Sequence, residues 1–434
     1  MFPLKKKTTF LLLACALALP SLALAQPEVP PTPAAAAAHS FSNVERRALT
    51  ADVAEYFFKV RVGSGPYDEI GVHRVVKETA PNVPARTAQA LFLAPGDIWN
   101  FRAAFLTGAH PLPVFLAENG VDVWGIDYRW SFVPAGEDTS FMQDWGIEQD
   151  ARDLGFALGV ARFTRAMTGS GLGKIFLLGW SRGGQIGYAY LNSETQLPPG
   201  HRQVAGFIPV DIYLKTDVPQ LKAFACQRQQ NTEATIAGGG YANPVGGLVA
   251  VLGVLAATDP NGSSILNGPP FNLPGYNNRQ AGLLVGEATF GLLGGLEPAP
   301  FYHFTGGTFD ADGKPAGLLY SNEADLFAFE QGSAPFQPNR ELADADAATC
   351  EQTDVAFDDH LSEITVPVLY VGAGGGFGEF GVYTTTLLGS TDVTTHIVSV
   401  ASPRIVDFGH ADLFLANNAQ TLVWQPILDW VQAH

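Results

Sequence analysis

KIFLLGWSRGGQIG, residues 174–187, is the stretch that decides the fold of this chain. Its residues 175–178 are four consecutive apolar residues, as expected of a strand that is buried on both faces. Gly179-Trp180-Ser181-Arg182-Gly183 follows directly, and residues 182–190 have a pattern that favours a helix. A strand, a G-x-S-x-G motif and a helix in this order are typical of a nucleophile elbow, which holds a serine on a tight turn above a sheet. The pattern therefore predicts Ser181 as a nucleophile; the alternative is a Gly-rich turn with a capping serine.

The same turn predicts one half of an oxyanion hole. The backbone N–H of Arg182 and the helix N-terminus would point to the place where an oxyanion forms. The second donor is expected from residues 94–100, where Gly96 lets the backbone turn and the N–H of Asp97 or Ile98 is the natural donor. The Asp97 carboxylate would oppose an oxyanion, so we expect it to face away, for example as the N-cap of the next helix.

Short apolar strands alternate with longer helical stretches on both sides of the elbow. A hairpin is expected at 55–62 and 69–78, further strands at 88–93, 121–128, 204–210, 366–371 and 395–400, and helices at 100–119, 143–167, from 382, and from 413 to the end. This alternation predicts an α/β fold, with a mostly parallel sheet covered by helices on both faces.

The alternation stops after Asp211 and resumes only near residue 363. Residues 213–362 are rich in Gly, Pro and Asn, with apolar helical stretches at 246–257 and 281–293. We expect a cap inserted into one α/β domain, whose core is 41–212 and 363–434. Within the cap, residues 310–313 resemble half of a calcium loop, but no downstream Glu completes it, so a turn between two strands is favoured.

A serine hydroxyl needs a base to take its proton, and His410 is the candidate base. It lies in the segment Asp407-Phe408-Gly409-His410-Ala411-Asp412, between the last expected strand and the last helix, on the same sheet edge as the elbow. A histidine on a surface loop without a catalytic role is the alternative interpretation.

The acid that orients this base is ambiguous in the sequence. The loop after the strand at 366–371 is rich in glycine and offers only Glu379, whereas Asp211 closes the strand that follows the elbow helix. Both keep the order serine, acid, histidine. Asp211 is slightly favoured because a strand end holds a side chain in a defined position.

The first 25 residues have the pattern of a cleaved secretory signal. Lys5, Lys6 and Lys7 precede an apolar stretch at 10–19, and Ala23-Leu24-Ala25 is a small-x-small cleavage site. Residues 26–40, rich in Pro and Ala, are expected to be a linker. The pattern predicts a secreted or periplasmic bacterial protein with no integral membrane segment after cleavage.

Charge and cysteine content narrow the class further. The formal charge of −17 argues against nucleic acid as a partner. No H-E-x-x-H or paired-cysteine spacing supports a metal site. If the signal is removed with Cys15, only Cys226 and Cys350 remain, and in an oxidising compartment they could form one disulfide or stay two buried thiols.

With these residues in hand, the chain resembles the α/β-hydrolase superfamily, and in particular its capped, secreted bacterial esterase- and lipase-like members. The resemblance rests on residues 179–183, on 409–412 (Gly-His-Ala-Asp), on 120–129 and on 366–369, and it covers about 40–215 and 363–434. It implies an eight-stranded sheet, a Ser-His-acid triad and no cofactor. Two positions depart from the family pattern: Pro95-Gly96 replaces His-Gly, and glycine stands where the acid is expected.

These expectations combine into a hydrolase of carboxylic esters. Ser181 would attack a small-molecule ester, His410 would transfer the proton, and Asp211 or Glu379 would orient the base. The apolar cap favours a substrate with an apolar acyl or alcohol part. Amide or peptide cleavage by the same triad, and a catalytically silent binding protein of this fold, are the alternatives.

Overall fold

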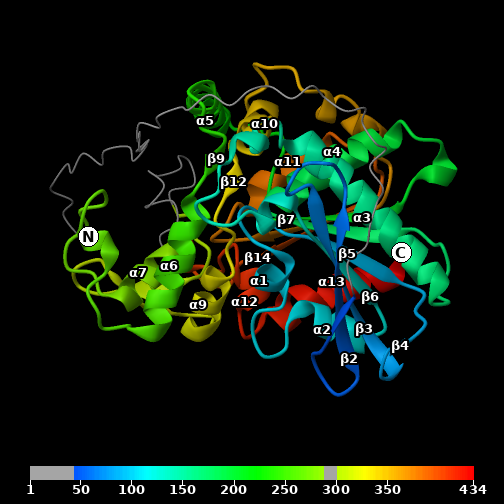
Figure 1. The fold of residues 1–434 in the computed structure, drawn as a ribbon, viewed down its shortest axis with the longest axis horizontal. Helices are drawn as coiled ribbons and strands as arrows, with labels where there is room; N and C mark the ends of the chain where they lie inside the picture. The colour runs from blue at the N-terminus through cyan, green and yellow to red at the C-terminus, as the bar shows by residue number, and fades with distance from the viewer. Residues whose placement is uncertain (1–43, 288–300) are drawn as a thin grey trace, which may run out of the picture.

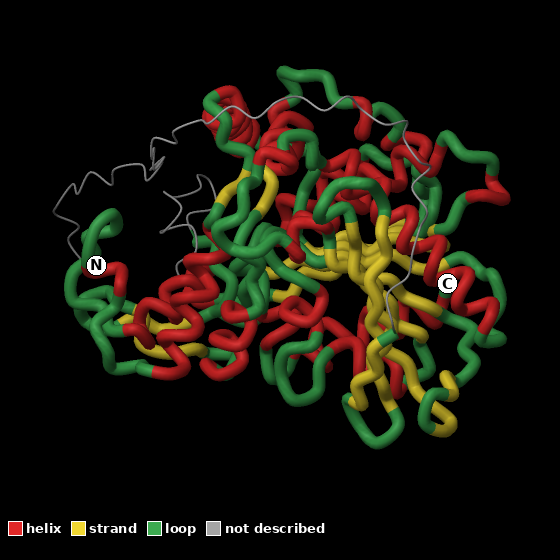
Figure 2. The backbone as a smooth tube through the Cα atoms, in the orientation of Figure 1, coloured by secondary structure: helices red, strands yellow, loops and turns green. Residues whose placement is uncertain are grey.

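In a computed structural model, which describes residues 44–287 and 301–434, a twisted sheet runs through the molecule (Figure 2). The sheet has ten described strands in the order β1-β2-β3-β6-β5-β7-β8-β13-β14, with β4 paired to β3. The strands are β1 (Glu45–Ala48), β2 (Val53–Arg61), β3 (Glu69–Ala80), β4 (Val83–Pro84), β5 (Ala90–Ala94), β6 (Asp122–Asp127), β7 (Ile175–Trp180), β8 (Val204–Val210), β13 (Val368–Ala373) and β14 (Val393–Val398).

The sheet is mostly parallel, as expected. The neighbouring strands β6, β5, β7, β8, β13 and β14 pair in parallel. The strands β1, β2, β3 and β4 form antiparallel pairs, including the expected β2–β3 hairpin, and β3 also pairs antiparallel with β6. The expected eight strands were too few, because the short strands β1 and β4 extend the antiparallel end. Neither short strand has the apolar run by which the other strands were found.

Helices cover both faces of the sheet. The main-domain helices are α1 (Phe101–Phe105), α2 (Leu112–Glu118), α3 (Ile147–Met167), α4 (Arg182–Thr195), α11 (Val382–Thr386), α12 (Asp412–Leu415) and α13 (Gln425–Ala433). Phe176 and Leu178 of β7 pack in one core with α2 and α13, while Ile175 and Leu177 pack in the other with α3 and α4. Successive side chains of a strand point to opposite faces, which explains why β7 is apolar at every one of these positions.

The segment between β8 and β13, residues 213–362, is called the insertion below. It contains α5 (Pro219–Ala237), α6 (Val245–Thr258), α7 (Asn278–Glu287), α9 (Glu323–Gln331) and α10 (Asn339–Cys350), and the strands β9 (Ala242–Asn243), β10 (Gly307–Phe309), β11 (Pro315–Leu318) and β12 (Gln337–Pro338). Figure 1 shows α6, α7 and α9 together at one side of the molecule, away from the β2–β3 hairpin. The expected turn at 310–313 joins the antiparallel strands β10 and β11.

Two expected helices are interrupted. The stretch 100–119 splits into α1 and α2 because Gly108 adopts a φ of 94° and Pro111 caps the second helix. The C-terminal stretch splits at Ala416, which forms a bridge to Ser321 of the insertion, and continues as a π-helix (Gln420–Trp424) before α13. Contacts made only in the folded molecule override the local helical pattern there.

Short 3₁₀ turns complete the described secondary structure, at Arg129–Phe132, Ser140–Met142, Pro199–His201, Ile265–Asn267, Ala356–Asp358, Leu361–Glu363, Gly378–Gly381 and Arg404–Val406. The signal segment, the linker expected at 26–40 and the end of the apolar stretch at 281–293 lie outside the described residues. Within the described ranges, we find no helix that is both long and apolar enough to cross a bilayer.

Candidate functional site

Ser181 lies on a sharp turn between β7 and α4. Its φ of 55° and ψ of −129° are strained for a residue with a side chain, as expected of a nucleophile elbow. The Ser181 N–H donates to the Val210 carbonyl at 3.0 Å, and the Ser181 carbonyl accepts from Gly184 at 2.8 Å. A Cβ on Gly183 would stand 2.2 Å from the Ala94 carbonyl oxygen, so a side chain there would push the helix off the sheet. The turn therefore requires the small residues that the sequence provides.

Asp211 follows β8 directly, beside the elbow, and is fully buried with a φ of 48°. Its carboxylate accepts hydrogen bonds from the backbone N–H groups of Ala373 (2.8 Å), Phe377 (3.1 Å) and Gly378 (2.8 Å). Three backbone donors hold both carboxylate oxygens of Asp211 in fixed positions. The glycine-rich loop after β13 thus encloses the Asp211 carboxylate.

The glycine in this loop has a steric reason. A Cβ on Gly376 would stand 2.0 Å from Asp211 Oδ2, so a side chain at this position would displace the carboxylate. Glu379, the other candidate acid, lies on the far side of the loop and is exposed. It forms an ion pair with Arg404 through two hydrogen bonds and makes no described contact with His410.

His410 is fully buried, and its Nδ1–H donates to Asp211 Oδ2 at 2.6 Å. The other ring nitrogen, Nε2, has no hydrogen-bond partner among the described residues. The His410 ring lies 4.9 Å from the ring of Trp180, the residue directly before Ser181. The structure therefore brings the histidine, Asp211 and the elbow together, but no hydrogen bond joins Nε2 to the serine hydroxyl, a bond that is often long in enzymes without substrate.

The loop after β5 touches the serine, where a second oxyanion donor was expected. A Cβ on Gly96 would be 2.7 Å from Ser181 Cβ. The backbone N–H groups of Asp97, Ile98 and Arg182 have no acceptor within the described part of the chain. The loop of Asp97 and Ile98 contacts Ser181 through Gly96, and Arg182 follows the serine, so these donors stay candidates for an oxyanion hole.

The Asp97 carboxylate faces away from the serine, but not as a helix cap. It accepts a hydrogen bond from Arg182 Nε at 2.8 Å, and Asn100 caps α1 instead by accepting from the Ala103 N–H. Partial burial acts to raise the pKa of Asp97, but the Arg182 guanidinium outweighs it and holds the pKa below its usual value.

Comparison with solved structures agrees with this architecture. A candidate lipase from Sulfolobus solfataricus superposes with a TM-score of 0.59 at 19% sequence identity, over 90% of this chain and 99% of that one. The chain has the α/β-hydrolase fold. A soluble variant of monoglyceride lipase from Saccharomyces cerevisiae, in complex with a substrate analog, matches with a TM-score of 0.45 at 10% identity, over 93% of this chain and 99% of that one. No protein-family model and no curated protein matches the sequence.

Within this α/β-hydrolase fold, the insertion contributes residues to the site that the sequence analysis missed. The rings of Tyr302 and Phe304 lie 5.3 and 5.5 Å from the His410 ring, and the ring of Phe377, from the loop after β13, lies at 6.0 Å. The backbone N–H of His410 donates to the backbone carbonyl of His303 at 2.9 Å. The sequence has an aromatic run at 301–304, but nothing local indicates that it packs against His410.

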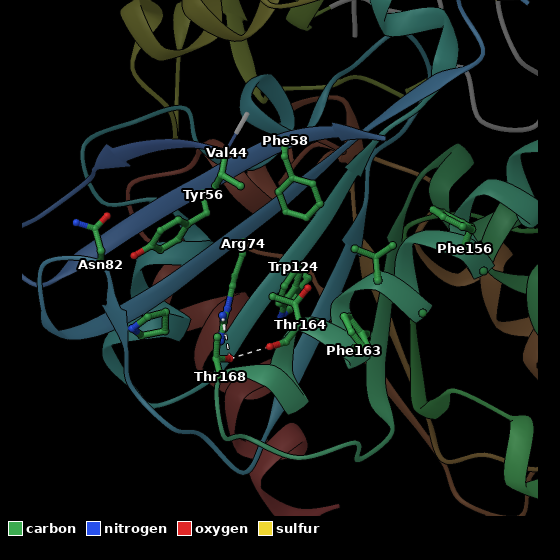
Figure 3. Close-up of a pocket in the computed structure, with 14 residues that line it drawn as sticks. Val44, Tyr56, Phe58, Arg74, Asn82, Trp124, Phe156, Phe163, Thr164 and Thr168 are labelled. Atoms are coloured by element: carbon green, nitrogen blue, oxygen red, sulfur yellow. Dashed lines mark hydrogen bonds between the residues drawn. The ribbon is translucent and has the colours of Figure 1, made fainter. Parts of the chain in front are cut away.

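A separate groove of about 760 Å³ lies elsewhere on the α/β-hydrolase core (Figure 3). Tyr56 and Phe58 of β2 form one wall and Phe156 and Phe163 of α3 the other, with Trp124 between them. None of the candidate catalytic residues lines it. In the described ranges, no group of three or more His, Cys, Asp and Glu residues is arranged to hold a metal ion.

Proposed function

We propose that this protein is a serine hydrolase of carboxylic esters, with Ser181 as nucleophile, His410 as base and Asp211 as the acid. The observation that carries the proposal is the 2.6 Å hydrogen bond between His410 Nδ1 and Asp211 Oδ2, directly behind a strained serine on a nucleophile elbow. The fold similarity to a candidate lipase is in keeping with this assignment.

In the first half-reaction, Ser181 Oγ attacks the acyl carbonyl carbon while His410 Nε2 takes the hydroxyl proton. The Asp211 carboxylate fixes the ring so that Nδ1 carries the proton and Nε2 offers its lone pair. The negative charge that forms on the carbonyl oxygen is stabilised by the N–H of Arg182 and by that of Asp97 or Ile98. His410 then gives its proton to the departing alcohol, and the acyl group stays on Ser181.

In the second half-reaction, a water molecule takes the place of the alcohol. His410 Nε2 accepts a proton from this water as it attacks the acyl-enzyme, and returns the proton to Ser181 as the acid is released. No step requires a metal or an organic cofactor, since protein groups make every proton transfer.

The surroundings of His410 favour a substrate with an apolar acyl or alcohol part. The rings of Tyr302, Phe304 and Phe377 surround the imidazole, and they would offer an apolar surface to a substrate that reaches it.

We further propose that the chain is exported and cleaved after Ala25, so that N-terminal sequencing of the exported protein would begin at Gln26.

A fluorophosphonate probe tests the catalytic assignment. We expect the wild type to be labelled and the Ser181→Ala variant not to be, because the probe forms its bond with an activated serine. Ser193→Ala, which changes a serine on the same helix α4, is the matched control and should be labelled like the wild type. Absence of labelling in a folded wild type would favour a catalytically silent binding protein.

Panels of p-nitrophenyl esters and of the matching anilides then separate ester from amide hydrolysis. We expect turnover of the esters, increasing from acetyl to longer acyl chains, and little turnover of the anilides. Faster cleavage of the anilides would contradict the proposal and assign the same triad to an amidase or peptidase.

A further inference from the structure

The loop that carries Asp97 and Ile98 is held in a strained conformation. Ile98 has a φ of 54°, although a β-branched side chain strongly disfavours positive φ. Residues persist in such conformations only where their surroundings fix them in place, and such strain is concentrated at functional sites. The contacts that hold this loop therefore bear on the position of its two N–H groups.

One of these contacts comes from the residue after the nucleophile. Arg182 Nε donates to Asp97 Oδ1 at 2.8 Å, and Arg182 Nη1 donates to Gln185 on the same helix. Gln185 is itself anchored through a 2.8 Å hydrogen bond to the Tyr213 carbonyl. Arg182 thus has two roles. Its backbone N–H is one candidate oxyanion donor, and its side chain holds the loop that carries the second donor.

Two carboxyl groups lie close to the Arg182 guanidinium, those of Asp97 and Glu341. Glu341 lies 3.7 Å from Arg182, but burial raises the pKa of Glu341 to about 8. Burial therefore disfavours the charged form of Glu341. Asp97 is left as the main counter-ion of Arg182, and their attraction acts on the loop.

The other contacts come from the insertion. Gln337 of β12 donates from Nε2 to the same Asp97 Oδ1, and the Ala334 N–H donates to the Ile98 carbonyl at 2.7 Å. The Gln337 side chain is almost fully buried, so its amide reaches the partly exposed Asp97 carboxylate from inside the protein. The insertion thus forms hydrogen bonds with both Asp97 and Ile98.

We propose that the side chains of Arg182 and Gln337 are positioning groups for the oxyanion hole: they hold the strained loop at Asp97 and Ile98 in place, so that the insertion completes the catalytic site. This inference rests on the proposed function, and it assigns a new role to the insertion. Neither side chain touches the substrate; both act through the Asp97 carboxylate.

Gln337→Leu tests the inference by removing the donor at nearly constant volume. We expect kcat on a p-nitrophenyl ester to fall about 10- to 100-fold with KM little changed, since the loop would misplace a donor that acts in the transition state. Inhibition by a boronic acid, which forms a tetrahedral anionic adduct with the serine, should weaken by a similar factor. A purely structural role would lower the melting temperature but would not separate kcat from KM in this way.

Gln229→Leu is the matched control. Gln229 of α5 is also buried and donates a side-chain hydrogen bond to Thr353 at 2.9 Å, whereas Gln337 donates to Asp97 and, at 3.5 Å, to Glu341; Gln229 does not contact the loop. Its kcat should equal that of the wild type. At Asp97, Asn keeps an acceptor and should retain more activity than Ala, while Arg182→Lys should restore part of what Arg182→Leu loses.

The outcomes separate this inference from the proposed function. If the wild type is labelled and active but Gln337→Leu has the same kcat and the same boronic acid inhibition, the positioning role is wrong and the ester hydrolase stands. If the wild type itself is neither labelled nor active, both proposals fail together.

Discussion

At the scale of single residues, the position of Asp211 is the most informative feature. Its carboxylate leaves from the end of β8, one strand before the loop in which the family resemblance would place the acid. The loop after β13 has glycine instead of the acid, and it surrounds Asp211 with three backbone N–H donors. The loop that lacks the carboxylate therefore supports one that comes from the neighbouring strand.

The two candidate acids give opposite predictions. Asp211→Asn should lower kcat by about 10³- to 10⁴-fold, because an amide cannot hold His410 in the right tautomer or stabilise its cation. Glu379→Gln should leave kcat nearly unchanged, since Glu379 pairs with Arg404 at the surface. Both are measured as kcat on one p-nitrophenyl ester, and a large loss in Glu379→Gln alone would overturn the assignment.

At the scale of secondary-structure elements, the insertion is closed by a covalent bond. Cys226 of α5 and Cys350 of α10 form a disulfide across 124 residues, which resolves the alternative of two buried thiols that the sequence left open. The two helices pack along each other, so the bond joins the beginning and the end of the insertion.

Removal of this bond should destabilise the protein measurably. For a loop of this length, the chain-entropy model gives about 5 kcal/mol as the largest effect on the free energy of unfolding. The double variant Cys226→Ser, Cys350→Ser should therefore unfold at lower urea concentration than the wild type. Reduced wild type is the control and should behave like the variant; identical midpoints with and without reductant would contradict the expectation.

The elements differ in how well the sequence predicts them. The strand β8 has the predicted bounds and the elbow has the predicted turn, because continuous apolar runs and a glycine-framed serine are local signals. The break at Ala416 and the ring of Tyr302 beside His410 depend on contacts between distant segments, and no local pattern contains them. The choice between Asp211 and Glu379 likewise required the three-dimensional position of the loop after β13.

At the scale of the whole molecule, buried carboxyl groups decide how stability depends on pH. Burial, helped by the charge of Glu323, raises the pKa of Glu287 to about 9. Burial opposes the charge of Glu55 too, but hydrogen bonds from His73 and Arg102 outweigh it and lower its pKa to about 2. The ordinary value for both is 4.5, so the two groups act in opposite pH ranges.

We therefore expect the melting temperature to be highest at mildly acidic pH. The contribution of Glu287 is fully present below pH 4.5 and is lost as the pH rises towards 9; that of Glu55 is present above pH 4.5 and is lost as the pH falls towards 2. Circular dichroism melts from pH 2 to 10 measure both limbs. Glu287→Gln should flatten the alkaline limb, whereas the exposed Glu45→Gln should not; an unchanged limb in Glu287→Gln would refute the role of this group.

The parallel pairing of β8 with β13 has a consequence for protein engineering. Residue 212 leaves the sheet at its carboxyl edge, whereas residue 367 returns at the amino edge, about 20 Å away for a six-residue strand. A variant in which residue 212 is joined directly to residue 363, to remove the insertion, would therefore be unable to keep β8 and β13 paired in parallel. A shortened enzyme would need a crossover connection of about a dozen residues in place of the insertion. It would also need a new donor for the Ile98 carbonyl, which accepts from Ala334 in the full chain.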